Sequence, residues 1–288
     1  AAPGSSDAAA DGSDAEGSDA DEASAPVPTR TARWTKATHF PTVASDLLPR
    51  IGVATSLAAA QRSGVKVTLT LTYPVKRVAW HKKGDYLVTI TPAAPSGAVM
   101  VHQLSKHASQ CPFAKNKGKL QMAVFHPSKP LLYVANQRSV RVYDLVKGDV
   151  QSKLECSVKW ISTLEMHPSG DHVVVGSYDH RTVWFDTELS NRPYKTLRYH
   201  SKAVRRAAFH PTLPLMATAS DDGTVHVFHT RVYHDFVTNP LIVPVKILRG
   251  HTVTSDGLGV LDCVFHPTQP WLISAGADHT LQLWHNLP

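Results

Sequence analysis

Cysteine is scarce in this 288-residue sequence, which holds three cysteines, far apart in the chain, at Cys111, Cys156 and Cys263. An odd number of widely spaced cysteines without a CxxC pair argues against a disulfide framework and a structural zinc site, and favours a reducing compartment. No stretch approaches the roughly 18 to 20 apolar residues that span a bilayer, so we expect no membrane contact. The first residues lack a basic region, an apolar region and an initiator methionine, so we expect no signal peptide, and a chain cut from a longer protein.

Signatures of catalysis and of phosphate binding are missing as well. The sequence contains no GxSxG, HExxH, GxxxxGK[ST] or GxGxxG motif. Adjacent Asp221 and Asp222 face apart on a strand that enters a turn, which suits turn formation better than paired acid–base work. The sequence holds 17 histidines, but no cysteine or carboxylate joins them at the spacing of metal ligands. We therefore expect no enzymatic activity, no metal site and no cofactor.

Charge divides the chain into an acidic start and a basic body. Residues 1–25 hold seven acids and no Lys or Arg, and they lack aromatic side chains, so we expect an acidic, disordered, low-complexity segment. Residues 26–64 show no clear period and are interpreted as an irregular linker or the remnant of a preceding repeat. The other domain, residues 65–288, is repetitive. Without the first 25 residues the chain carries a net charge of +14, which attracts nucleic acid or acidic partners.

The repetitive domain contains five copies of one pattern, a hydrophobic strand that ends in an aromatic residue or Met followed by His. Their spacings are 45, 41, 43 and 56 residues, and a period near 40 to 45 is typical of β-propellers. An insertion that contains NPLIVP and TSDGLG accounts for the longest spacing. The histidines of the five copies are His81, His126, His167, His210 and His266.

Each copy predicts four short antiparallel strands, the content of one propeller blade. A Pro or Gly turn follows the histidine, then a buried run such as LLYVA, then an alternating strand such as SVRVYD, TVWFD, TVHVFH or TLQLWH. In the third of these, Val225 and Val227 point to one side, and His226 and Phe228 point to the other. An outer strand such as YKTLRYH or VKILRGH leads to the next copy. The fold class is therefore an all-β WD40 β-propeller with five blades in this chain.

The best copies match the WD-repeat pattern at positions that hydrogen-bond as a chain within one blade. An aspartate in the turn accepts hydrogen bonds from turn amides and from histidine, which satisfies polar groups that are costly to bury unpaired. In the fourth copy Phe228 takes the place of the usual Trp. The positions predicted to form this structural network are His200, Thr218 and Asp222 in the fourth copy, and His251, Ser274, Asp278 and Trp284 in the fifth.

The closure of the ring has two possible forms. The fifth copy stops just after Trp284 and lacks an outer strand, and the segment KVTLTL at residues 66–71 is a candidate to supply it, which would close a five-bladed ring. Alternatively, further blades precede this chain and the five blades belong to a larger ring. Periodicity alone does not choose between these forms.

One stretch of the basic body is a candidate contact surface for RNA or an acidic partner. Leu189–Ser220 contains no acid, and aromatic residues alternate there with cations. A smaller cluster, Lys115, Lys117 and Lys119, lies in an equivalent connection two copies earlier. The alternative interpretation is solvated surface charge. The candidate contact residues are Arg192, Lys195, Arg198, Lys202, Arg205 and Arg206.

Residues 65–287 closely resemble the C-terminal propeller of the block-of-proliferation family of ribosome biogenesis proteins. The resemblance is carried by HQLSKHASQCPFAKNKG, VKWISTLEMHPSGDHVVVGSYD, PYKTLRYHSKAVRRAAFHPTLPLMATASDDGTVHVFH, NPLIVPVKILRGH and GVLDCVFHPTQPWLISAGADHTLQLW. It implies a seven-bladed ring with an acidic insertion in an early blade, so that two blades and a long N-terminal region of the family are missing here.

The same resemblance implies a scaffold for the maturation of large-subunit rRNA, located in the nucleus, nucleolus and nucleoplasm. Its implied partners are pre-ribosomal RNA, a second WD-repeat protein of the same complex, and Pescadillo, whose binding is associated with the missing N-terminal region. An alternative function is a WD-repeat adaptor that binds peptides in a chromatin or ubiquitin-ligase complex. A preference for RNA over peptides, with an affinity that falls steeply with salt, would speak against that alternative.

Overall fold

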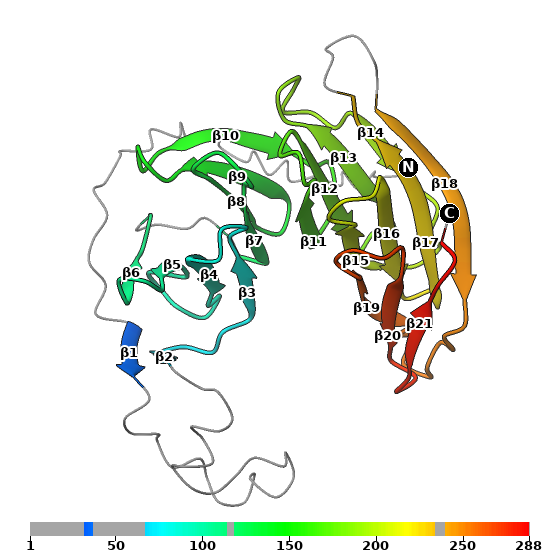
Figure 1. Ribbon diagram of the computed structural model, residues 1–288, viewed down its shortest axis with the longest axis horizontal. Helices are drawn as coiled ribbons and strands as arrows, with labels where there is room; N and C mark the ends of the chain where they lie inside the picture. The colour runs from blue at the N-terminus through cyan, green and yellow to red at the C-terminus, as the bar shows by residue number, and fades with distance from the viewer. Residues whose placement is uncertain (1–31, 37–66, 114–117, 234–239, 288) are drawn as a thin grey trace, which may run out of the picture.

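The computed structural model describes residues 32–36, 67–113, 118–233 and 240–287. Within these residues the regular elements are 21 β-strands, and five successive groups of strands form the blades of a β-propeller, as the sequence predicts. The blades follow one another along an arc, with the first blade at one end and the fifth at the other (Figure 1). The predicted acidic segment 1–25, most of 26–64, Lys115 and Lys117 lie outside the described residues. Within the described part of the chain, no helix is long and apolar enough to cross a membrane.

Each blade is an antiparallel sheet whose strands follow chain order, from the inner strand of the ring to the outer one. The first blade contains β3 (Arg77–Trp80), β4 (Tyr86–Ile90), β5 (Val99–Gln103) and β6 (Ala108–Gln110). The second contains β7 (Met122–Phe125), β8 (Leu131–Ala135), β9 (Ser139–Asp144) and β10 (Val150–Glu155). The third contains β11 (Ile161–Met166), β12 (His172–Ser177), β13 (Thr182–Asp186) and β14 (Lys195–Leu197).

The last two blades differ in their outer strands. The fourth contains β15 (Val204–Phe209), β16 (Leu215–Ser220), β17 (Thr224–Arg231) and β18 (Leu241–Arg249). The fifth contains three described strands, β19 (Val260–Phe265), β20 (Leu272–Gly276) and β21 (Leu281–Trp284). The long outer strand β18 begins with LIVP, so part of the insertion that lengthens the fourth spacing forms the β17–β18 ribbon. The predicted strands LLYVA, SVRVYD and TVWFD coincide with β8, β9 and β13.

Of the two possible forms of closure, the structure does not show the one in which residues 66–71 complete the fifth blade. The strand in this segment, β2 (Val67–Leu71), pairs with β1 (Ala32–Lys36), for which the sequence showed no period. Trp34 of β1 explains the placement, because its indole Nε1–H donates to Ser109 Oγ at 2.8 Å and its ring packs edge-on against His107. These contacts hold the β1–β2 pair beside the first blade, at the other end of the arc from β21 (Figure 1).

The repeat histidines hold the turns between the first two strands of the blades. In all five, Nδ1 accepts a backbone N–H from the turn that follows, at 3.1 Å for His81, 2.9 Å for His126, 3.2 Å for His167, 2.9 Å for His210 and 3.0 Å for His266. Each ring therefore caps its turn as a hydrogen-bond acceptor. Burial lowers the pKa of His81 and of His126, which favours the neutral ring.

The hydrophobic core lies between blades, because each strand alternates its side chains toward the blade on either side. On β17, Val225 and Val227 pack toward the fifth blade with Phe265, while Phe228 packs toward the third blade with Trp184. This is the alternation that the sequence predicts. The ring is thus assembled from interfaces between neighbouring blades.

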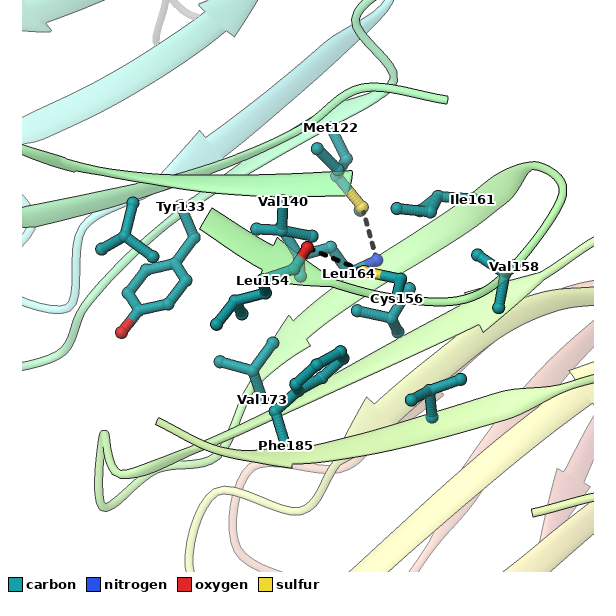
Figure 2. Packing of buried hydrophobic residues seen from close by; sticks show 14 residues of the cluster. Met122, Tyr133, Val140, Leu154, Cys156, Val158, Ile161, Leu164, Val173 and Phe185 are labelled. Atoms are coloured by element: carbon teal, nitrogen blue, oxygen red, sulfur yellow. Dashed lines mark hydrogen bonds between the residues drawn. The ribbon is translucent and has the colours of Figure 1, made fainter. Parts of the chain in front are cut away.

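Figure 2 shows the interface between the second and third blades. The Leu164 amide N–H points at the Met122 sulfur, 3.1 Å away, and Cys156 is enclosed by the same cluster. Burial raises the pKa of Cys156 and of Cys263 to about 12 and also raises the pKa of Cys111, so the thiols stay protonated. All three cysteines are buried and free. They act as small apolar side chains rather than as nucleophiles or metal ligands.

The two terminal blades carry apolar side chains on the faces that turn away from the arc. In the fifth blade Val264 is opposite Ile273, and Ile273 is opposite Leu283, so the three form a row across the sheet. All three side chains are exposed, as are those of Val78 and Trp80 in the first blade. These rows have the composition of the buried faces between blades elsewhere in the protein. They support the sequence-based expectation of a larger ring, which stays a prediction.

Candidate functional site

One end of the blades carries the connections from one blade to the next, and we call it the connection face. Three of these connections are residues 156–160, 198–203 and 250–259. The turns between the second and third strands lie at the same end, because each strand reverses the direction of the chain. In the last four blades these turns are residues 136–138, 178–181, 221–223 and 277–280.

In the fourth blade, His200 ties the connection to this turn. Its Nε2 lies 2.8 Å from Thr218 Oγ1, and its Nδ1–H donates to Asp222 Oδ2 at 2.9 Å. The same carboxylate oxygen accepts the Ser201 amide at 3.1 Å. Burial acts to raise the pKa of Asp222, but hydrogen bonds from His200 and Thr224 outweigh it and hold that pKa below its usual range. The ionised carboxylate therefore fixes the connection onto the turn.

The fifth blade repeats this arrangement. His251 Nε2 lies 2.8 Å from Ser274 Oγ, and His251 Nδ1 lies 3.2 Å from Asp278. The Trp284 indole N–H also donates to Ser274 Oγ, at 2.8 Å, which links the third strand to the network. The structure thus brings together all seven residues for which a blade network was predicted, as one group in each blade. Their contribution to stability stays a prediction.

Replacing Asp222 by alanine should lower the free energy of unfolding by about 1–3 kcal/mol, because buried turn donors and His200 lose their acceptor. Chemical denaturation followed by circular dichroism measures the loss. Asp256→Ala is the matched control, because Asp256 is an exposed acid in the next connection. Asp278→Ala should also lower the free energy of unfolding. Unfolding curves for Asp222→Ala and the parent that superimpose would contradict the structural role of the network.

The predicted contact residues do not form one surface. Arg192 lies in the connection between β13 and β14, at the end of the blade opposite the connection face. Lys195 lies on the outer strand β14, where its Nζ donates to the Ile242 carbonyl of the fourth blade at 3.4 Å. Arg198 is exposed just after β14, and Lys202 lies in the connection to the fourth blade.

Two of the six cations are bound by carboxylates from elsewhere in the chain. The Arg205 guanidinium lies 2.7 Å from Asp221 Oδ2. Arg206 lies between Glu165 and Asp262, at 3.3 Å and 3.5 Å, and so bridges three neighbouring inner strands. The stretch Leu189–Ser220 contains no acid, but the fold brings two acids from other strands to Arg206. We therefore assign Arg206 to the structure of the ring and not to a contact surface.

A different set of residues spans the connection face of the second, third and fourth blades. The Ile161 amide donates to the Gln137 carbonyl at 2.8 Å, which joins the turn of the second blade to the start of β11. The Tyr178 amide donates to the Trp160 carbonyl at 3.0 Å, and the Arg205 guanidinium lies 5.1 Å from the centre of the Tyr178 ring. We call this set the aromatic–cationic strip: Arg138, Lys159, Trp160, Tyr178, Lys202 and Arg205.

The strip combines exposed aromatic rings with positive charge, part of which is exposed. Lys202 is half-buried, and its Nζ donates to the Gly257 carbonyl at 3.5 Å. The side chains of Trp160 and Tyr178 are 42% and 41% exposed, and their rings meet edge-to-face at 6.5 Å. Arg138 and Lys159 are exposed beside them. Exposed aromatic rings can stack on nucleic-acid bases, and Lys and Arg can contact phosphates. In the described part of the chain, no group of His, Cys, Asp and Glu is placed to hold a metal ion.

The sequence contained a signal for this strip that an acid-free window does not reveal. Lys159 and Lys202 both stand eight residues before a repeat histidine, so the repeat places them at equivalent positions in neighbouring blades. Tyr178 likewise occupies the position of Asp221, one residue after the second strand of its blade. Aligning the Lys and Arg residues of the five copies by their position in the repeat, instead of searching one window of sequence, would have found the strip.

Comparisons with known proteins agree with the repeats. The family model described as WD domain, G-beta repeat matches residues 191–229 and 242–285. The chain is similar to ribosome biogenesis protein ERB1 of Yarrowia lipolytica, with 54% identity over 231 residues, which cover 80% of this chain and 28% of the relative. It is 54% identical over 228 residues to the BOP1 homolog of Chlamydomonas reinhardtii, over 79% of this chain and 28% of that protein. Mouse BOP1 is 50% identical over 221 residues, 77% of this chain and 30% of that protein.

Proposed function

Because the chain belongs to the ERB1/BOP1 family of ribosome biogenesis proteins, we propose that it is a non-enzymatic scaffold for the maturation of large-subunit rRNA. The chain spans between about a quarter and a third of the length of the relatives that it matches, so the proposal concerns the part that lies in the propeller. In this proposal the propeller binds pre-ribosomal RNA through the aromatic–cationic strip. The protein acts in the nucleus, nucleolus and nucleoplasm, where the large subunit is assembled.

The single observation that carries RNA binding is the exposed Trp160–Tyr178 pair among cations. A base that stacks on an exposed ring places its phosphates within reach of nearby Lys and Arg side chains. Such contacts do not depend on the identity of the base, which suits a scaffold that holds a folded precursor. Arg205 contributes by ordering the Tyr178 ring, since Asp221 already balances its charge.

The proposal includes protein partners. A propeller that binds RNA at one face has its other surfaces available to a second WD-repeat protein of the same complex. Binding of Pescadillo is assigned to a region of the family outside these 288 residues. Pull-down of the second WD-repeat protein by the purified chain, without Pescadillo, is the expected pattern.

Replacing Trp160 by alanine should weaken binding to large-subunit precursor rRNA about tenfold, because one stack of a base on an aromatic ring contributes roughly 1–3 kcal/mol. Fluorescence anisotropy with a labelled single-stranded fragment of that rRNA measures the affinity. The matched control is Trp271→Ala. Trp271 is 40% exposed, but it lies in the turn just before β20, at the opposite end of its blade, so its loss should leave the affinity unchanged.

The competing function, a peptide-binding adaptor of chromatin or ubiquitin-ligase complexes, predicts another outcome. An adaptor would bind peptides in preference to rRNA, and Trp160→Ala would not change its weak, nonspecific affinity for RNA. Equal losses in Trp160→Ala and Trp271→Ala would also contradict the proposed interface, since they would indicate a general effect of removing surface aromatics.

A further inference from the structure

A cleft between the first and second blades lies at the end opposite the connection face. Its volume is about 540 Å³, within the range of sites that hold a ligand or a peptide side chain. Three turns surround its mouth: those between β3 and β4, between β7 and β8, and between β9 and β10. The walls reach Val101 on β5 and Gln110 on β6, so the cleft runs along the junction of the two blades.

The floor of the cleft is apolar. Phe125 forms part of it, with the His81 ring edge-on at 5.4 Å between centroids. Burial lowers the pKa of His81, so the ring presents a neutral surface. The remaining apolar lining comes from Tyr86, Val101, Pro112, Pro130, Leu131 and Leu145. At the mouth, the Val146 side chain is 79% exposed and extends the apolar lining to the rim.

The rim is positively charged. Lys83, Lys129 and Lys147 line the cleft, one from each of the three turns, and the lining contains no Asp or Glu. Lys129 Nζ pairs with Glu188 at 2.9 Å, from the third blade. In the described part of the chain, neither Lys83 nor Lys147 forms an ion pair with a carboxylate. Two lysines at the mouth of an apolar cleft are therefore free of ion pairs with the described residues, and the nearest carboxylate to Lys147, that of Asp144, accepts backbone amides of the turn.

Hydrogen bonds fix the shape of all three turns. His81 Nδ1 accepts the Lys83 amide at 3.1 Å, and Asp144 Oδ1 accepts the amides of Val146 and Lys147 at 2.8 and 3.1 Å. The Leu145 amide donates to the Pro130 carbonyl at 2.9 Å, which joins two of the turns to each other. A ligand therefore meets a cleft that is already formed, and binding loses little ordering entropy.

We propose that this cleft is a docking site for an acidic peptide segment of a partner protein, with one apolar side chain of the peptide in the cleft and its carboxylates on Lys83 and Lys147. Charge complementarity selects an acidic partner, and the apolar floor gives an aliphatic or aromatic anchor its place. A nucleic acid fits less well. Its phosphates would satisfy the lysines, but most of the apolar lining is aliphatic or proline, Phe125 is recessed, and the exposed Tyr86 ring lies edge-on to His81 at 6.2 Å.

A pair of synthetic peptides tests the site on the full chain. The probe is a fluorescein-labelled peptide with a Leu-Phe pair flanked by glutamates on both sides, and its partner peptide carries Ser-Ser in place of Leu-Phe. Fluorescence anisotropy should show saturable binding of the Leu-Phe peptide and at least about tenfold weaker binding of the Ser-Ser peptide, since the anchor buries an apolar surface. Equal affinities for the two peptides would overturn the proposal.

Charge-reversal variants locate the binding. Lys83→Glu combined with Lys147→Glu should weaken binding of the Leu-Phe peptide about tenfold or more, because electrostatic attraction at the mouth becomes repulsion. Lys153→Glu combined with Arg198→Glu makes the same change in net charge at exposed positions outside the cleft and its three turns, and should change the affinity less than about twofold.

Three outcomes contradict the proposal. An equal loss in both double variants would mean that the peptide responds only to net charge. Absence of saturable binding below about 1 mM peptide would mean that the cleft holds no such ligand. Displacement of the peptide by oligouridylate at lower concentration than by unlabelled peptide would make the cleft a nucleic-acid site. Trp160→Ala should not change peptide binding, so this test is independent of the proposed RNA interface.

Discussion

Replacing Trp184 by alanine should lower the free energy of unfolding by about 3–5 kcal/mol, the usual cost of removing a fully buried large aromatic side chain. Trp184 is completely buried on β13, between the third and fourth blades. Its ring packs edge-on against Phe209 at 5.4 Å, and Val174, Met216 and Phe228 complete the cluster. Because the Trp184 side chain lies between two blades, the cavity that its removal leaves weakens the packing of both.

The hydrogen bond of Trp184 differs from that of the tryptophan in the fifth blade, Trp284, because the two residues stand at different positions of the repeat. Trp284 packs against the fourth blade, and its equivalent in the third blade is Phe185, which lies on the other face of β13 from Trp184. The third blade also carries Val175 where the fifth carries Ser274. The Trp184 indole N–H donates to His172 Nδ1 at 3.3 Å.

Denaturant titration measures the loss of unfolding free energy in Trp184→Ala, and Trp184→Phe is the informative comparison. Phenylalanine keeps most of the buried ring surface and loses the indole N–H, so it should lose less stability than alanine. A loss below about 1 kcal/mol for Trp184→Ala would mean that the blades do not depend on their shared core.

The repeat and its strands could be predicted from the sequence because both depend on local chemistry. The Pro and Gly turns after His126 and His167, and the alternation around Val225 and Val227, are local properties of the chain. The residues of each blade network stand at the same positions of the repeat, so a single alignment predicts that they lie together. A hydrogen bond within one blade joins residues about 10 to 30 positions apart, a distance that the repeat itself fixes.

Contacts between blades could not be predicted in this way. Glu165, Arg206 and Asp262 stand on three different inner strands, and nothing in the local sequence indicates that the ring brings them together. The pairing of β2 with β1 depends in the same way on Trp34, which finds Ser109 in the first blade. A window of sequence without acids is therefore a poor guide to a free positive surface in a propeller, since the neighbouring blade supplies carboxylates.

Reversal of three charges in the aromatic–cationic strip should have the largest effect on function. Arg138→Glu, Lys159→Glu and Lys202→Glu together should weaken binding to large-subunit precursor rRNA about 100-fold at 0.1 M salt. Each phosphate contact on a single strand contributes a salt exponent of roughly 0.7 through the release of counterions, and three contacts contribute about two powers of ten at that salt. Arg205 is left in place, because a glutamate there would face Asp221 and destabilise the turn.

The matched control carries the same change in net charge at the opposite end of the blades. It combines Lys82→Glu, Lys106→Glu and Arg192→Glu. These residues lie in turns between the first two or the last two strands of a blade. This variant also tests Arg192, which the sequence grouped with the contact residues and the fold separates from them. It should bind the rRNA with an affinity close to that of the parent.

The affinity for large-subunit precursor rRNA across a salt series, measured for the parent and the two triple variants, tests the RNA-binding face most directly. We predict that the slope of log affinity against log salt becomes shallower by about 2 in the Arg138, Lys159 and Lys202 variant, and that the control keeps the slope of the parent. Both variants should retain the circular dichroism spectrum of the parent. Equal slopes for a folded strip variant and the parent would contradict the account and return these cations to ordinary solvated surface charge.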